Sequence, residues 1–396
     1  MSRSKARLAR RPLAVSIILL LAALVSEAAA QPLPSNESVA GLLQARLGSK
    51  PESVIVVGLY ERKATRTVAF GPSGSKAPVS DGDTVFEIGS ITKTFTAALL
   101  ADMVVRGEVR ITDPVSKYLP PEVHMPTHDG RAITLLDLAT QSSGLPRLPG
   151  NLSPRDASNP YGDYTVAQLY EFLSGYSLSR DPGEKYEYSN LGFGLLGHAL
   201  ARRAAASYEE VVRARILDPL KMTDTGIALT PGMKARLAPG HDERGRRVPN
   251  WDIPTLAGAG ALRSSVGDML KYIGAQLGAA PPELGRAIGM TQEVRHPTGR
   301  PGVEIALAWH VLHRAGHDIV WHNGGTGGYH SFVGFETKCG CGVVVLSSLS
   351  VNSDDLGLHL LDDSYPLADA KKASRPEPGS ATSIKPRGLI EKGPAT

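Results

Sequence analysis

Residues 331–348 read SFVGFETKCGCGVVVLSS, two apolar runs joined by a short polar turn. Residues 331–336 and 342–348 are rich in Val and Phe and too short for ordinary helices, so each is expected to form a β-strand. Residues 305–313 and 318–321 show the same kind of pattern just upstream. Four such runs separated by turn residues predict consecutive antiparallel strands at this end of the chain.

The other end of the chain carries a second strand signal. Residues 53–60 and 65–70 predict two strands joined by a polar turn, whereas residues 90–277 are dominated by helical patterns between Pro- and Gly-rich loops. We therefore expect an α+β, two-lobed fold. It would have one antiparallel sheet built from both chain ends and flanked by helices, with an all-helical lobe inserted between them.

Short motifs place several helices. Thr165 can cap a helix through residue 172, Ser207 with Glu210 forms a capping box for a helix through residue 217, and Ser265 precedes a helix over 269–277. Further helices are expected at residues 38–47 and 356–361. These elements divide the domain, residues 31–365, into a sheet lobe (about 38–85 and 300–365) and a helical lobe (about 86–299), followed by a proline-rich, disordered tail at 366–396.

Composition and charge exclude several classes of protein. The chain has 396 residues, 42% hydrophobic and 21% charged, which supports a large buried core rather than a disordered or fibrous protein. Of its 43 basic and 39 acidic side chains, five and one respectively lie in the first thirty residues, leaving 38 of each sign. This balance gives no basic footprint for nucleic acid.

The first thirty residues have the arrangement of a secretory signal. A basic stretch is followed by the apolar residues 13–25 and by three alanines that end at Ala30. Thirteen residues rise about 20 Å as a helix, less than the roughly 30 Å of a hydrocarbon core, so export is favoured over the alternative of an uncleaved anchor. We expect cleavage near Ala30 and a periplasmic or secreted protein without a stable membrane span.

The two cysteines, Cys339 and Cys341, are separated by Gly340 in a predicted strand. They would lie on one face of that strand, where a disulfide closing so small a loop would be strained, so two buried free thiols are expected. No histidine, cysteine or carboxylate group shows convincing metal-ligand spacing, and no metal site is predicted.

Three motifs could carry chemistry. Ser90 and Lys93 lie one turn apart at the start of a predicted helix, so the amine could activate the hydroxyl if burial or nearby positive charge lowers its pKa. Tyr188 and Asn190 precede an apolar helix and could supply a phenol and an amide, although a helix cap beside a packed aromatic is the simpler interpretation.

The third motif, residues 321–328, joins two predicted strands and is rich in glycine. Such a strand lets a ligand approach the backbone closely, and His322 at its head could be a cation or a neutral donor near physiological pH. A flexible turn and a phosphate cradle are the alternatives. The predicted strand after the motif, where a phosphate loop has a helix, argues against the cradle.

Taken in order, Ser90-x-x-Lys93, Tyr188-Ser189-Asn190 and His322-Asn323-Gly324-Gly325 resemble the three active-site motifs of the serine β-lactamase and penicillin-recognising family. The Tyr-Ser-Asn form is similar to that of class C β-lactamases and their DD-peptidase and esterase relatives. The likeness covers roughly residues 38–361 and includes the neighbouring stretches 141–146 and 218–222.

The resemblance implies roles for individual residues. By that likeness Ser90 is the acylated nucleophile, Lys93 the neighbouring base and Tyr188 the group that relays protons. Asn190 would hold the substrate's amide side chain, and the backbone amides of Ser90 and Gly325 would form the oxyanion hole. Spacing leaves open whether Lys93 or Tyr188 takes the first proton.

The third motif departs from the family pattern. His322-Asn323-Gly324 stands where class C enzymes usually have Lys-Thr-Gly, and a His with an unperturbed pKa near 6.5 is only partly charged at neutral pH. One hypothesis is that the charged form of His322 binds a substrate carboxylate. The departure weakens the expectation of a β-lactamase but not that of acyl-serine chemistry.

The sequence thus predicts an exported serine hydrolase that works through an acyl-enzyme on Ser90 and needs no metal or organic cofactor. β-Lactams are the first expected substrate, D-alanyl-D-alanine peptides the second and small carboxylic esters the third. A penicillin-binding sensor, acylated at Ser90 but never released, is the alternative from another class.

Overall fold

The computed structural model describes residues 32–47, 52–71 and 81–368. The predicted secretory signal at 1–30 and nearly all of the predicted tail at 366–396 lie outside these residues. The helices of the described part are α1 (Asn36–Leu47), α2 (Thr92–Val105), α3 (Leu135–Ala139), α4 (Val166–Gly175), α5 (Asn190–Ala204), α6 (Tyr208–Val212), α7 (Pro231–Ala235), α8 (Ala257–Gly260), α9 (Val266–Gly274), α10 (Pro282–Gln292) and α11 (Asp354–Leu361).

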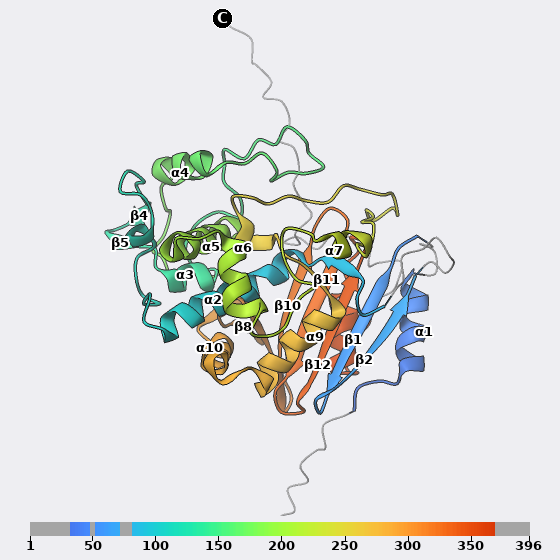
Figure 1. Cartoon of the computed structure of the whole chain (residues 1–396). Coiled ribbons are helices and arrows are strands. Elements are labelled where there is room, and N and C mark those ends of the chain that lie inside the picture. Colours follow the sequence, from blue (N-terminus) through green and yellow to red (C-terminus); the bar gives the residue numbers. More distant parts are fainter. Residues whose placement is uncertain (1–31, 48–51, 72–80, 369–396) are drawn as a thin grey trace, which may run out of the picture. The chain divides into compact units, whose positions relative to one another are not determined.

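The main sheet is antiparallel and has the order β2-β1-β12-β11-β10-β9-β8-β7. Of its two N-terminal strands, β1 pairs with the last strand, β12, and β2 lies at the edge beyond β1 (Figure 1). This arrangement confirms the expectation of one sheet assembled from both chain ends. The strands are β1 (Ile55–Glu61), β2 (Ala64–Phe70), β7 (His296–Arg300), β8 (Val303–Ile305), β9 (His310–Arg314), β10 (His317–Gly325), β11 (His330–Glu336) and β12 (Cys341–Ser347).

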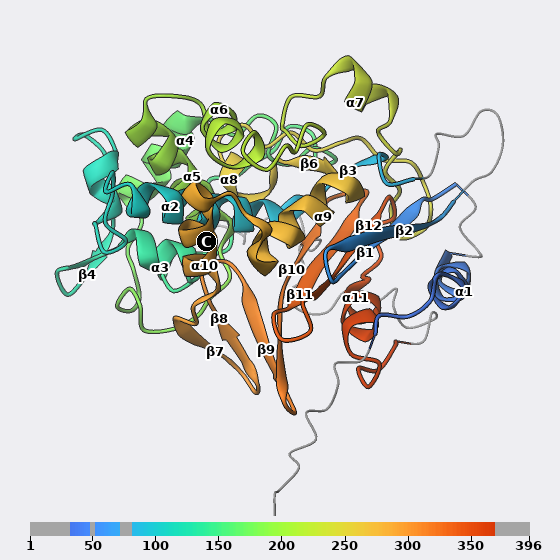
Figure 2. The same ribbon diagram turned by 60° about the horizontal axis from the view of Figure 1, so that its bottom comes forward.

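Helices cover both faces of this sheet, which explains why β1, β11 and β12 are buried along nearly their whole length. Figure 2 shows α9 on one face and α1 and α11 on the other. Gly58 and Gly342 let α9 pack closely, because a Cβ atom at either position would lie 2.5 Å from a side chain of that helix. On the opposite face, Val39, Leu43 and Leu47 of α1 join the apolar cluster of β1, β12 and α11.

The segment between the strands of the main sheet is mostly helical. Two of its helices begin where the capping motifs predict, and the helix predicted over residues 269–277 begins earlier, as α9 at Val266, directly after its cap Ser265. Thr165 caps α4 and Ser207 caps α6, each in a complete capping box. The helix expected through residue 217 continues beyond α6 as a π-helical turn, η3 (Arg213–Leu217). Two short strand pairs lie in the described chain outside the main sheet: β3 (Val85–Glu87) with β6 (Arg263–Ser265), and β4 (Thr127–His128) with β5 (Arg131–Ala132).

The strand predicted over residues 305–313 is wrong in its middle. β8 ends at Ile305 and β9 begins at His310, because the chain turns between them: Ala306 N donates to Trp309 O (2.8 Å), and Ala308 has a positive φ of 67°. The turn buries Trp309 completely. β7 was not predicted, since its sequence HPTGR contains Pro and Gly and lies at the edge of the sheet.

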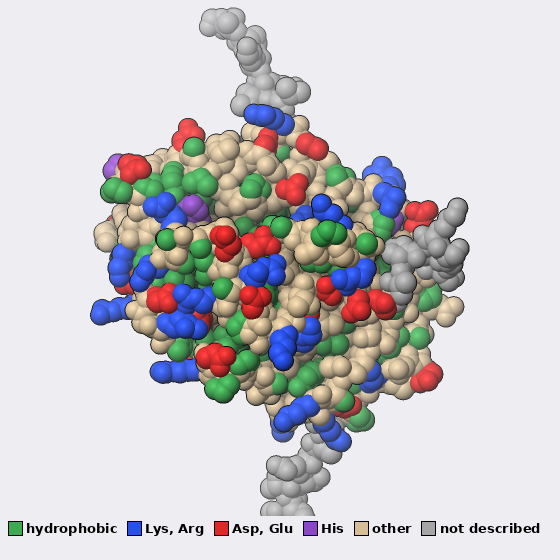
Figure 3. Space-filling model, viewed as in Figure 1, with side chains coloured by type: hydrophobic (Ala, Val, Ile, Leu, Met, Phe, Trp, Pro, Cys, Tyr) green, Lys and Arg blue, Asp and Glu red, His purple; other side chains and the backbone are tan. Residues whose placement is uncertain are grey.

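Charges of both signs are interspersed on the face seen in Figure 3, in keeping with the balanced charge of the chain after residue 30.

Helices α5 and α2 are the longest of the described part, at 15 and 14 residues. Within the described ranges, no helix is both long and apolar enough to cross a membrane.

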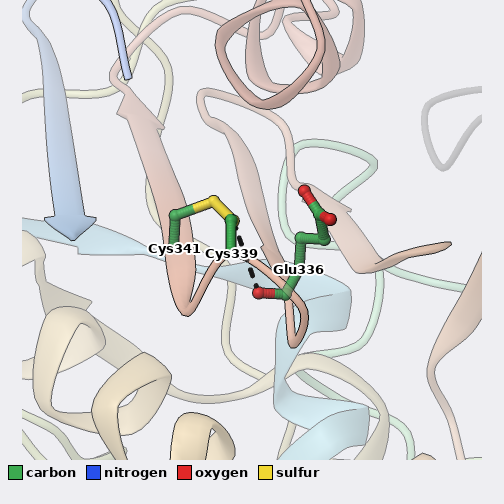
Figure 4. Close-up of side chains that lie close together, drawn as sticks. All are labelled: Glu336, Cys339 and Cys341. Carbon is green, nitrogen blue, oxygen red and sulfur yellow. Dashed lines mark hydrogen bonds between the residues drawn. A yellow bond between two sulfur atoms is a disulfide. The ribbon is translucent and has the colours of Figure 1, made fainter. Parts of the chain in front are cut away.

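The expectation of two free thiols is wrong: Cys339 and Cys341 form a disulfide (Figure 4). Cys339 lies in the turn before β12 rather than in the strand, and Gly340 adopts a positive φ of 63°. This turn brings the two Cα atoms to 5.3 Å, within the usual range for a disulfide. An extended strand, which the spacing suggested, does not describe this geometry.

The disulfide predicts how the cysteines react. Iodoacetamide added to the unfolded, unreduced protein should add no carbamidomethyl group at Cys339 or Cys341, because a disulfide sulfur is not alkylated. After reduction both cysteines should be modified. Intact mass measurement distinguishes the two states, and alkylation of both residues without reduction would show that they are free thiols.

Candidate active site

Ser90 lies where a helix meets the sheet. It belongs to a 3-10 turn, η1 (Gly89–Ile91), which continues as α2, so it is inside the turn and does not cap α2. The turn lies directly against β10: a Cβ atom at Gly89 would lie 2.8 Å from Gly325 N, and one at Gly324 would lie 2.1 Å from Ile88 O. Two glycines, one with a φ of 48°, therefore permit this close approach.

Lys93 is completely buried and reaches three oxygen atoms. Its Nζ atom lies 2.9 Å from Ser90 Oγ, 2.9 Å from Asn190 Oδ1 and 2.6 Å from Ala259 O. Burial, and to a lesser extent the charge of Arg147, hold the pKa of Lys93 well below its usual value. A neutral amine has two N–H donors and one lone pair. In the neutral form, with both donors directed at the two carbonyl oxygens, the lone pair would face the Ser90 hydroxyl.

Tyr188 lies next to the same amine. Lys93 Nζ is 4.9 Å from the centre of the Tyr188 ring, and Arg147 Cζ is 5.0 Å from it. Burial raises the pKa of Tyr188 to about 12, although a hydrogen bond with the Ser90 side chain and the charge of Arg147 act to lower it. The phenol is therefore protonated at neutral pH.

Asn190 is the first residue of α5, which Ser189 caps by accepting from Gly192 N (2.8 Å). Besides accepting from Lys93, the Asn190 side chain donates from Nδ2 to the Tyr161 hydroxyl (3.2 Å). Gln141 Oε1 in turn accepts from Ser189 N (2.7 Å). The stretch that includes Gln141 therefore fixes the backbone that presents Tyr188 and Asn190 to Lys93.

A cavity of about 20 Å³ opens beside Ser90. Its walls include Tyr161, Asn190, Trp251, Gly325 and Thr326. The structure thus brings Ser90, Asn190 and Gly325, which come from three motifs far apart in the sequence, to one small space.

The chain matches the family model described as Beta-lactamase over residues 42–364. It belongs to the beta-lactamase family. The D-alanyl-D-alanine-carboxypeptidase/endopeptidase AmpH of Escherichia coli K12 is 32% identical over 272 residues, which are 67% of this chain and 69% of AmpH. A protein named Beta-lactamase from the same organism is 30% identical over 211 residues, 53% of this chain and 52% of that protein.

Among solved structures, a class C beta lactamase from Rhodobacter sphaeroides superposes with a TM-score of 0.69 at 24% identity. The match covers 86% of this chain and 98% of that one, and it supports the fold. With the family match, it confirms the resemblance drawn from the three motifs, and the chain is a serine hydrolase of this family.

In this member of the beta-lactamase family, the third motif carries a neutral histidine. His322 is 1% exposed, and its Nδ1 donates to Asn323 O (2.6 Å). Burial, followed by the nearby His310 and Lys93, lowers the pKa of His322 well below its usual 6.5. Burial therefore disfavours the charged form of His322 that the hypothesis of carboxylate binding requires.

Sequence reasoning missed three residues around the site. Arg147 follows the quoted stretch 141–146 by one position and places its guanidinium beside Tyr188. Tyr161 and Trp251 line the cavity from loops that carry no motif. A basic residue next to a family-like stretch was a usable signal for Arg147, whereas nothing local marks the two aromatic residues.

The close approach of β10 to η1 predicts that Gly324→Ala is destabilising. The added Cβ would meet Ile88 O and Ser90 N, both backbone atoms, so the strand must shift away from the turn. We expect a loss of about 1–3 kcal/mol in the free energy of unfolding, measured by urea denaturation.

Gly285→Ala is the matched control, because a Cβ atom at this position in α10 meets nothing within 4 Å. It should be neutral or stabilising. Equal stability of the two variants would mean that the packing of β10 against η1 does not require a glycine at position 324.

Proposed function

We propose that this protein hydrolyses acyl compounds through a covalent acyl-enzyme on Ser90. The observation that carries the proposal is the buried Lys93 amine, 2.9 Å from Ser90 Oγ and bonded to two carbonyl oxygens on its other side. A serine hydroxyl becomes a useful nucleophile when an adjacent base takes its proton. Lys93 meets both requirements for that base, proximity and a lowered pKa.

In the proposed acylation, the Lys93 lone pair takes the Ser90 proton as Oγ attacks the carbonyl carbon. The backbone amides of Ser90 and Gly325, which both line the cavity, would stabilise the negative oxygen that develops. The bond between carbonyl and leaving group then breaks, and the leaving atom receives a proton. Because Tyr188 is protonated and contacts both Ser90 and Lys93, it is the proposed donor of that proton and recovers one from Lys93.

In the proposed deacylation, water attacks the ester on Ser90 and passes a proton back through the same groups, which releases a carboxylic acid and restores the hydroxyl. These roles also order the two candidate bases. At neutral pH the Tyr188 phenol holds its proton, whereas burial favours the neutral form of the Lys93 amine. Lys93 is therefore the proposed first base, and Tyr188 the relay.

β-Lactams are the first proposed substrate class, supported by the Tyr188-Ser189-Asn190 motif and the similarity to the E. coli beta-lactamase. Hydrolysis of D-alanyl-D-alanine peptides is the second candidate, and the similarity to AmpH, over more of the chain, favours it. We also propose that residues 1–30 direct export, which would place the enzyme where both classes of substrate occur.

The acyl-enzyme predicts a covalent adduct on one residue. Incubation with benzylpenicillin or 6-aminopenicillanic acid should add the mass of the antibiotic to Ser90, seen by intact and peptide mass spectrometry, and the adduct should decay as product forms. Ser90→Ala should form no adduct and should lower turnover by a factor of about a thousand or more.

Lys93→Ala is a second control, since it keeps the nucleophile but removes the proposed base. It should slow adduct formation without moving the adduct to another residue. A persistent adduct without product would instead identify a penicillin-binding sensor, and the absence of any adduct with penicillins, esters and fluorophosphonates would refute the proposed chemistry.

The position of Arg147 predicts a shifted pH profile. Its positive charge disfavours the ammonium form of Lys93 and favours the phenolate form of Tyr188, so it lowers both pKa values. In Arg147→Met both pKa values should rise. The ascending limb of kcat/KM against pH, which reports loss of the Lys93 proton, and the descending limb should therefore both move to higher pH.

Arg147→Lys keeps the charge and should keep both limbs near their wild-type positions. Thermal unfolding of the two variants checks that the fold is retained. Limbs that stay in place in the folded Arg147→Met variant would show that this charge does not tune Lys93 and Tyr188.

A further inference from the structure

Two hollows of very different size meet at Trp251. The cavity beside Ser90 measures about 20 Å³. A groove of about 420 Å³ lies next to it, with walls that include Pro160, Asp242, Arg246 and Gly327. Trp251 lines both spaces. Trp251 is therefore a wall that the space beside the nucleophile shares with the larger groove.

The main chain of Trp251 is fixed by hydrogen bonds to a buried ion pair. Glu87 Oε1 accepts from Trp251 N (2.9 Å), and Trp251 O accepts from Arg263 Nη2 (2.9 Å). Glu87 and Arg263 are themselves 3.5 Å apart, with side chains 4% and 8% exposed. A backbone held at both its N–H and its carbonyl by buried charges is not free to swing as a loop tip.

The indole is also fixed from its sides. Its ring lies 5.6 Å from that of Tyr161, and Tyr161 is bonded in turn to Asn190. A Cβ atom at Gly327 would lie 2.8 Å from Trp251 Nε1, so the indole packs directly against the backbone of the glycine-rich segment after β10. The ring is therefore part of the wall around Ser90.

The volumes decide what can enter. A cavity of about 20 Å³ holds about one water molecule. Sites for small molecules are usually several hundred Å³ in volume, which is the size of the groove and not of the cavity. With the indole in place, the ring crowds a long acyl side chain at Ser90, so donors with short side chains, such as 6-aminopenicillanic acid among the penicillins, should acylate Ser90 faster than benzylpenicillin does.

We propose that Trp251 sets the upper size limit of the acyl group that Ser90 accepts, and that the protein is accordingly selective for acyl donors with short side chains. Removing the indole joins the cavity to the groove, so that longer acyl groups can lie across the former position of the ring. The inference rests on the acyl-enzyme function proposed above and narrows its substrate class.

The test is a chain-length series of p-nitrophenyl esters: acetate, butyrate and hexanoate. For the wild-type protein, kcat/KM should fall as the acyl chain lengthens. In Trp251→Ala the ratio of acetate to hexanoate should decrease by about tenfold or more, the discrimination that a few methylene groups give at a tight wall. Trp251→Phe keeps a ring and should give an intermediate ratio.

Two controls keep the inference separate from the proposed function. Tyr176→Ala removes an aromatic side chain from the end of α4, packed on Phe172 outside the cavity wall, and should leave the ratio unchanged. Ser90→Ala should abolish hydrolysis of all three esters. If it does not, the proposed acyl-enzyme is wrong. If it does, but folded Trp251→Ala keeps the wild-type ratio, the role of Trp251 is wrong.

A folding defect does not block the test. Thermal unfolding shows which variants are folded, and Trp251→Leu, which keeps an apolar side chain under the same backbone contacts, carries the same expectation if Trp251→Ala unfolds. An unchanged ratio in either folded variant would overturn the inference.

Discussion

The buried amine of Lys93 joins the parts of the protein that make the candidate site. Its nitrogen lies within 3 Å of atoms from η1, α5 and α8, and these three elements come from different parts of the chain. An unpaired buried ammonium would be strongly destabilising. The three oxygen partners and the lowered pKa of Lys93 both reduce the cost of burying this amine. The same contacts that make this buried group tolerable leave its lone pair directed at Ser90.

Close packing of helices makes those contacts possible. Gly197 of α5 meets Gly258 of α8 so closely that a Cβ atom at position 197 would lie 2.8 Å from Gly258 Cα. Thr96 of α2 donates to Gly258 O (2.8 Å), which ties the third helix to the same point. The two glycines therefore bring Ala259 O to the amine, just as Gly89 and Gly324 bring the sheet to the other side of Ser90.

The charges around the amine follow from the same burial. His322 is buried, so a proton on its ring would be desolvated, and any proton on the nearby His310 or Lys93 would repel it; the ring therefore stays neutral. The Arg147 guanidinium lies 5.0 Å from the centre of the Tyr188 ring. Burial thus favours the neutral forms of both the Lys93 amine and the His322 imidazole.

The sequence by itself determined the fold class and the three motifs whose residues form the candidate site. Alternation and capping motifs located most strands of the main sheet and several helices, because these elements depend on neighbours a few residues apart. The three motifs identified Ser90, Lys93 and Tyr188 as candidate site residues. The tertiary structure decided the rest. It set the turn that allows the disulfide between Cys339 and Cys341, the interruption between β8 and β9, the neutral state of His322, and the positions of Arg147 and Trp251. Each of these depends on burial or on contacts between distant segments, and local sequence does not encode how much water a folded chain excludes around a given side chain.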